Sequence, residues 1–154
     1  MTETERLVDL MDRAFSGPAW HGPAVLEVLK DIPSEEAAAH PLDHIHSIWE
    51  LVLHMATWKN VARWRLEKIE RVPTDAENFP PVIHTDTQSW NAAIETLKTA
   101  HAQLREAVVK LDPPRLDEEI PAGGGLTHFV RLNGVIHHDL YHAGQIALLK
   151  KILG

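Results

Sequence analysis

The chain has 154 residues, of which 44% are hydrophobic and 24% are charged, and it contains no cysteine. This length predicts a single domain over residues 1–154 that can bury a core. The lack of cysteine excludes disulfides, thiolate metal sites and cysteine nucleophiles. The formal charge of −7, without any basic run, argues against a nucleic-acid partner.

Two further features bear on where the protein works. No apolar run approaches the roughly 18 residues that span a bilayer, so we expect no membrane partner. Residues 1–6 are acidic, where a secretion signal would be basic and then apolar. We therefore expect a cytoplasmic protein.

The one residue type with an unusually high count is histidine, with 11 residues.

The N-terminal part of the chain predicts a first helix with a kink. Apolar residues recur at helical spacing over residues 7–15 and again over residues 25–29. Pro18 and Pro23, each preceded by glycine, interrupt the pattern between these stretches. We expect one helical arm that is kinked or broken near residues 18–23.

A second and a third helix follow, separated by a linker. Ser47 is a plausible N-cap with Glu50 at capping-box spacing, and an apolar stripe then runs to about residue 70. Residues 71–87 contain three prolines and no apolar period, which is typical of a linker. The third helix runs from about residue 88 to Leu111, before a pair of prolines.

The last part of the chain predicts a loop and a fourth helix. Residues 115–127 include Pro121 and three consecutive glycines, whereas residues 128–153 again show a helical apolar stripe. Because no alternating β-type run competes, the sequence predicts an all-α four-helix bundle. The linker can extend to roughly 55 Å, longer than a helix of about 35 Å. Helices two and three can therefore run parallel, in up-down-down-up order, although a slack loop between antiparallel neighbours is the alternative.

The fourth helix contains the segment HHDLYHAGQI, residues 137–146. His138 and His142 are four residues apart, so both project from one face of the helix and can bind one metal ion. Asp139 stands where the zinc-protease motif has glutamate, which argues against that class. Two histidines at this spacing are also common on exposed helix surfaces, and two ligands do not complete a site.

A third histidine lies in the second helix. His54 stands in the apolar stripe between Leu51 and Trp58, where a buried imidazole needs a polar partner. A divalent cation bound by three neutral imidazoles would satisfy all three at once and leave an open position, the pattern of a reactive site. The alternative is a bundle without metal, in which the histidines are hydrogen-bonded in the core.

Two segments resemble the DinB-like family of metal-binding helix bundles: WELVLHMATW, residues 49–58, and HDLYHAGQI, residues 138–146. The segments GPAWHGP (17–23) and HSIWEL (46–51) are similar to one branch of it. The resemblance implies an up-down-down-up four-helix bundle, a homodimer and a three-histidine site for zinc or nickel. Carried over by position, the metal ligands would be His54, His138 and His142.

Other residues are weaker candidates for catalysis. Glu50 lies one turn before His54 and is a candidate general base, with helix capping as the alternative. Tyr141 and Gln145 are candidates to donate hydrogen bonds near the metal. Asp139 could orient a ligand imidazole or could simply be an exposed helix carboxylate.

Further histidines lie outside the predicted stripes. The resemblance includes His21 and His46, which could line the mouth of a pocket, while His46 could instead fix the start of helix two. His128, at a helix end, is expected to be solvated.

These features lead to two hypotheses of function. The first is a metal-dependent transferase or hydrolase that acts on a small molecule, such as a thiol adduct, because the family shares a superfamily with thiol-dependent S-transferases. The alternative is a non-catalytic, metal-stabilised or sensory helix-bundle dimer, which the lack of an evident general base supports.

Overall fold

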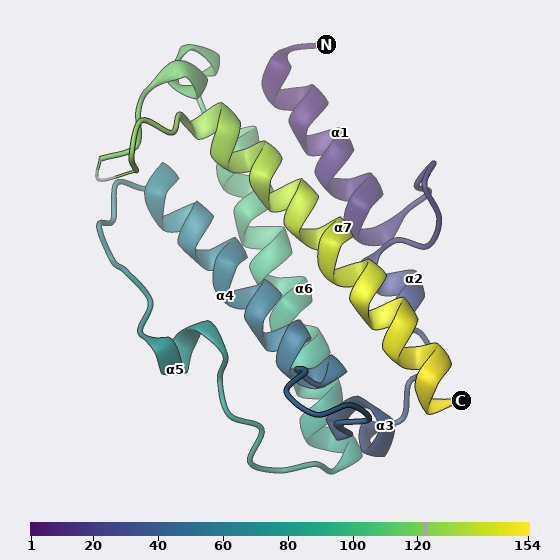
Figure 1. The fold of residues 1–154 in the computed structure, drawn as a ribbon. Helices are drawn as coiled ribbons and strands as arrows, with labels where there is room; N and C mark the ends of the chain where they lie inside the picture. Colours follow the sequence, from purple (N-terminus) through teal and green to yellow (C-terminus); the bar gives the residue numbers. More distant parts are fainter. Residues whose placement is uncertain (122) are drawn as a thin grey trace.

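The computed structural model describes residues 1–121 and 123–154, and it is helical throughout this range apart from loops and one isolated bridge between Glu119 and Thr127 (Figure 1). The prediction of an all-α fold is therefore confirmed. Among the described helices, none is long and apolar enough to cross a membrane. The elements in chain order are α1 (Glu3–Ser16), α2 (Val25–Leu29), α3 (Ser34–Ala38), α4 (Ile48–Leu66), α5 (Asp75–Asn78), α6 (Thr87–Val109), the 3-10 helix η1 (Pro113–Asp117) and α7 (His128–Leu153).

The first helical arm is broken and not merely kinked, which is one of the two outcomes that the sequence predicts near residues 18–23. Helix α1 ends at Ser16, and the N–H of Gly17 caps it by donating to the carbonyl oxygens of Asp12 and Arg13. Gly17 has φ of +85°, a conformation that favours glycine and turns the chain out of the helix. Two prolines follow within six residues, so helical hydrogen bonding resumes only in α2.

The later elements match the predicted ranges with small differences. Helix α4 ends at Leu66, before the predicted end near residue 70, and its capping box of Ser47 and Glu50 is present. The predicted linker contains the single-turn helix α5, which Thr74 caps by accepting from the N–H of Glu77. The loop predicted over residues 115–127 begins within η1 and includes Ala122, which lies outside the described residues.

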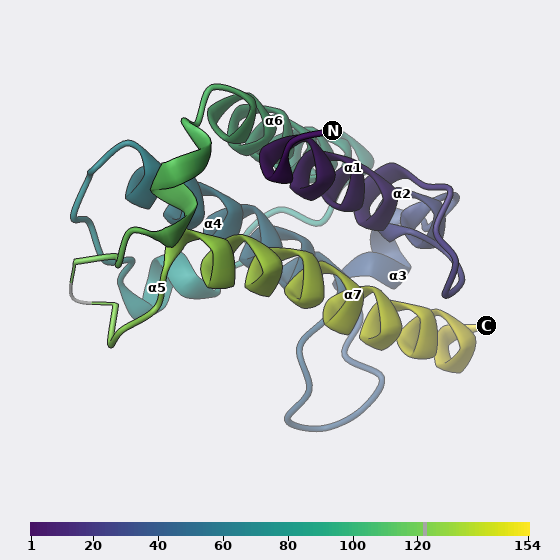
Figure 2. The same ribbon diagram turned by 90° about the horizontal axis from the view of Figure 1, so that it is seen from above.

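Four long helices form the body of the molecule. Helix α4 contacts both α6 and α7, and α1 contacts the same two helices from the other side. In Figure 1 the chain leaves the upper end of α4, passes α5 and returns to the lower end, where α6 begins. Figure 2 shows α4 between α6 and α7, with α1 beside α6. This arrangement brings α4 and α7 side by side, although 61 residues separate Leu66 from His128.

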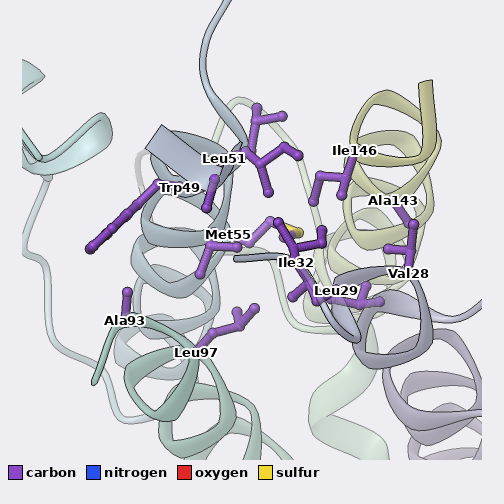
Figure 3. Close-up of a cluster of buried hydrophobic side chains, with 14 of the residues drawn as sticks. Val28, Leu29, Ile32, Trp49, Leu51, Met55, Ala93, Leu97, Ala143 and Ile146 are labelled. Carbon is purple, nitrogen blue, oxygen red and sulfur yellow. The ribbon is translucent and has the colours of Figure 1, made fainter. Parts of the chain in front are cut away.

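The apolar core consists of two clusters. One lies between α2, α4, α6 and α7 and includes Met55, Leu97 and Ile146 (Figure 3). The other lies between α1 and parts of α4, α6 and α7 and includes Leu7 and Leu104. Between the two clusters, the facing positions of α4, α6 and α7 carry polar side chains instead. We call these residues the central polar layer: His54, Lys59, His101, His138, Asp139 and His142.

Candidate metal centre

Three histidines of the central polar layer meet through their Nε2 atoms. His138 Nε2 lies 3.1 Å from His54 Nε2 and 3.0 Å from His142 Nε2. His54 and His142 are buried and His138 is half-buried. One ligand atom of each residue lies within 4.8 Å of the others, a spacing that can hold one metal ion. We call this group the three-histidine cluster.

The outer nitrogens of two of these rings determine their tautomers. The Nδ1–H of His54 donates to the backbone carbonyl oxygen of Asn78 at 2.8 Å. The Nδ1–H of His142 donates to the side-chain oxygen of Gln145 at 2.6 Å. Because a neutral imidazole carries one N–H, both Nε2 atoms then present lone pairs to the interior of the cluster.

The donor set fits a divalent cation. Without a metal, His138 can donate at most one Nε2–H, whereas two acceptors, the Nε2 lone pairs of His54 and His142, face it. The metal-free cluster therefore leaves one of these two acceptors without a hydrogen bond. Ligand nitrogens in a tetrahedral zinc site, with bonds of about 2.0–2.1 Å, lie about 3.3 Å apart, close to the separations found here. Burial lowers the pKa of all three imidazoles, and that of His138 falls to about 3. The rings are therefore neutral near neutral pH, the state in which imidazole binds metal.

Two residues that support the cluster come from the linker. Phe79, just after α5, stacks between His46 and His54, with ring centroids 3.7 Å and 4.1 Å away. Asn78 accepts from His54 through its carbonyl and from Trp58 Nε1 through its side chain. Neither residue could be predicted from the sequence, because the linker has no apolar period that would place them.

Two cavities adjoin the three-histidine cluster. The larger cavity, of about 430 Å³, reaches His142, and the smaller cavity, of about 270 Å³, reaches His138. The larger is lined by Leu42, His44, Ile45, His46, Leu51, Phe79, Tyr141, His142, Gln145, Leu148, Leu149 and Ile152. The smaller is lined by Trp58, Leu126, Val130, Arg131, Gly134, Val135 and His138. An outside molecule could therefore approach the cluster from either side.

The family model of the DinB superfamily matches residues 19–146, a range that contains all three clustered histidines. The chain belongs to the DinB superfamily. The DinB-like resemblance of the two histidine segments is thus confirmed. No curated protein and no solved structure matches the chain.

In this DinB-superfamily chain, Glu50 is occupied by neighbouring donors. Its carboxylate accepts from the N–H of Ser47 at 2.8 Å, from His40 Nε2 at 3.0 Å and from His46 Nδ1 at 3.3 Å. Burial raises its pKa, but the hydrogen bonds from Ser47 and His40 outweigh burial and leave the pKa below its usual value. The capping role is therefore confirmed, while a role as general base stays a prediction.

Tyr141 and Gln145 both line the larger cavity beside His142. The Tyr141 ring lies edge-on to the His142 ring, with centroids 5.1 Å apart, and most of its surface is exposed. Gln145 accepts a hydrogen bond from His142, whereas a donor was expected from the sequence. Catalytic roles for these two side chains stay predictions.

The remaining sequence candidates lie in different surroundings. His46 both lines the larger cavity and contacts Glu50 at the start of α4, so the two predicted roles coincide. His21 is exposed on the segment between α1 and α2. His128 is buried, and the expectation of a solvated side chain was wrong. Its backbone N–H donates to the carbonyl of Glu118, which folds the preceding turn against the start of α7.

Asp139 is neither exposed nor bonded to a ligand imidazole, which overturns both expectations for it. Its Oδ2 accepts from Lys59 Nζ at 2.5 Å, and both residues are only 1% exposed. Lys59 Nζ also lies 3.4 Å from His101 Nδ1, and His101 Nε2 lies 3.3 Å from Asp12 at the surface. Since the lysine donates, His101 accepts at Nδ1 and donates from Nε2 to Asp12. A buried polar chain thus links α4, α6 and α7 beside the cluster.

Gln145 tests the importance of the contact that orients His142. Gln145→Leu removes the acceptor for His142 Nδ1–H, and such losses typically lower metal affinity about 10- to 100-fold. We expect this decrease in zinc affinity, measured by competition with a chromophoric chelator. Gln103→Leu, at an exposed position on α6, is the matched control and should bind zinc as the wild type does. Equal affinities of the two variants would show that the contact is dispensable.

His101 predicts a pH dependence of stability. Burial, with the nearby charge of Lys59, lowers its pKa from 6.5 to about 4. The unfolded chain therefore binds a proton that the folded chain excludes, so this residue's contribution to stability is lost as pH falls from 6.5 towards about 4. In urea unfolding of the zinc-free protein, His101→Gln should reduce the slope of stability against pH by up to about 1.4 kcal/mol per unit. Parallel slopes for the two proteins would contradict this assignment.

Proposed function

We propose that His54, His138 and His142 hold one zinc or nickel ion, and that this DinB-superfamily protein is a metal-dependent transferase or hydrolase acting on a small molecule, such as a thiol adduct. The observation that carries the proposal is the convergence of three neutral imidazole nitrogens next to two cavities. When bound, such an ion supplies Lewis acidity and acidifies water or a thiol at its open position.

The surrounding residues support this chemistry in three ways. Asn78 and Gln145 accept from the outer ring nitrogens and so hold His54 and His142 in the ligating tautomer. Neutral imidazoles leave the site cationic, which favours an anionic ligand such as a thiolate. The larger cavity, which reaches His142, has a volume in the range of small-molecule sites and a lining of mainly apolar side chains.

A second candidate is a non-catalytic metal site with a structural or sensory role. It is favoured by the carboxylates: three donors bond to Oε2 of Glu50, and among the described residues neither cavity beside the cluster is lined by Asp or Glu. A thiol-dependent transfer has less need of a carboxylate base than hydrolysis has, so this observation weighs mainly against the hydrolase.

Elemental analysis of protein purified without a histidine tag tests the proposal. We expect one zinc or nickel ion per chain, and protein without a stoichiometric divalent ion would overturn the proposal.

Chelation then separates the catalytic candidate from the structural or sensory one. A catalytic ion should leave a folded apoprotein whose melting temperature changes modestly, whereas a structural ion should carry much of the stability with it.

The order of the four long helices, the single domain, the homodimer and the cytoplasmic location are part of the same proposal. An up-down-down-up order is supported by the return of the linker to the end where α4 begins (Figure 1). A single domain over residues 1–154 is supported by the two core clusters, which both draw on α4, α6 and α7. The homodimer and the cytoplasmic location stay predictions from the family resemblance and the composition.

A further inference from the structure

One face of α7 carries apolar side chains away from the bundle core. Tyr141, Leu148 and Ile152 form this exposed face at helical spacing, while the neighbouring Leu149 is buried in the apolar core. Tyr141 is 66% and Leu148 60% exposed, although both are large apolar side chains, and both line the cavity that reaches His142. Exposed apolar groups gathered at one place commonly mark a binding site.

The opposite wall of the larger cavity combines apolar side chains with His44 and His46. Leu42 and Ile45, both partly exposed, come from the segment before α4, and Phe79 comes from the linker. Among the described residues that line this cavity, none is Asp, Glu, Lys or Arg. A charged group between these apolar side chains would give up part of its hydration and would meet histidine, tyrosine and glutamine side chains in place of a carboxylate, lysine or arginine. The cavity volume of about 430 Å³ lies in the range that small-molecule sites occupy.

The smaller cavity has a different chemistry. Arg131 lines it next to His138, and the Nε of this arginine is buried without a hydrogen-bond partner. Arg131 is the one charged residue among the described residues that line the smaller cavity, and an apolar occupant there would remove part of the hydration of its cation. The two sides of the three-histidine cluster therefore differ in the ligand groups that they accept.

We infer that the larger cavity binds an uncharged apolar tail of the substrate, so that the substrate is a small amphiphile with an anionic, metal-binding head and an aliphatic or aryl tail. This inference rests on the proposed function, since it places the head at the three-histidine cluster. The tail lies along α7 from His142 towards Leu148 and Ile152, between this helix and the segment that carries Leu42 and Ile45.

A series of linear alkyl hydroxamates provides the probe. Acetohydroxamate presents only a metal-binding head, and octanohydroxamate adds six methylene groups. Each buried methylene is expected to increase affinity roughly threefold to fourfold. By titration calorimetry on the zinc-loaded protein, octanohydroxamate should therefore bind at least roughly 100-fold more tightly than acetohydroxamate.

Paired variants on α7 locate the tail. Leu148→Asp places a charge at the exposed rim of the larger cavity. In this variant the affinities for acetohydroxamate and octanohydroxamate should come to within a few-fold of each other. Val130→Asp, at an exposed residue that lines the smaller cavity, is the matched control and should preserve the chain-length effect. Loss of the effect in Val130→Asp alone would overturn the inference, because the tail would then occupy the other side.

The outcomes separate this inference from the proposed function. If acetohydroxamate binds but chain length has no effect, the tail site is refuted and the open metal site stands. If the zinc-loaded protein does not bind acetohydroxamate at all, the open metal site itself fails. Sedimentation gives a third outcome: a wild-type dimer that Leu148→Asp dissociates would assign the apolar face to a second copy of the chain and overturn the tail site.

Discussion

Lys59→Met should destabilise the zinc-free protein by about 3–5 kcal/mol, because it leaves the buried Asp139 carboxylate without its cation. Asp139 Oδ1 already lacks a hydrogen-bond partner, so the contact from Lys59 to Oδ2 is the main compensation for burial of this group. Burial raises the pKa of Asp139, and removal of Lys59 would raise it further. Urea unfolding near neutral pH measures the loss.

Two further variants make this result specific. Lys59→Met combined with Asp139→Leu replaces the pair by apolar side chains and should recover most of the lost stability, since buried pairs are often no more stabilising than apolar residues. Lys110→Met removes an exposed pair with Glu106 and should cost less than about 1 kcal/mol. A loss in Lys59→Met no larger than in Lys110→Met would mean that the buried pair contributes nothing particular.

His138→Ala should lower zinc affinity by more than roughly 100-fold, because removal of even an outer partner of a metal ligand costs about 10- to 100-fold. His138 Nε2 lies within 3.1 Å of both other Nε2 atoms, so its loss leaves two ligands that do not complete a site. Competition with a chromophoric chelator measures the affinity, and circular dichroism checks that the helices persist.

His137→Ala is the matched control for this second prediction. His137 precedes His138 in α7 but is exposed and lies outside the cluster. We expect it to bind zinc with the wild-type affinity. If both alanine variants bind zinc equally well, the ion is held elsewhere and the three-histidine cluster is not a metal site.

Much of the local structure could be predicted from the sequence, because its causes are local. The capping box of Ser47 and Glu50 sets the start of α4, and Gly17 with two prolines ends α1. The four-residue spacing of His138 and His142 places both on one helix face whatever the helix packs against. The apolar periods of α4, α6 and α7 depend on neighbouring residues in the same way.

The polar residues in those apolar periods show where sequence reasoning stops. Lys59, His101 and Asp139 each stand at a core-facing position of a different helix, which is a detectable signal of a buried polar group. Their partners could not be found in this way, because the pairing depends on which helices pack together and at what axial height.

The sequence by itself determined where the long helices lie, to within a few residues at their ends, and which face of each carries the apolar stripe. Only the tertiary structure decided that His54 meets His138 and His142, that Lys59 meets Asp139, and that the linker places Phe79 on the His54 ring. The physical reason is the distance along the chain over which each kind of interaction acts. Helical periodicity and capping act within a few residues, whereas the cluster joins positions 84 residues apart whose meeting depends on the packing of two apolar clusters above and below it.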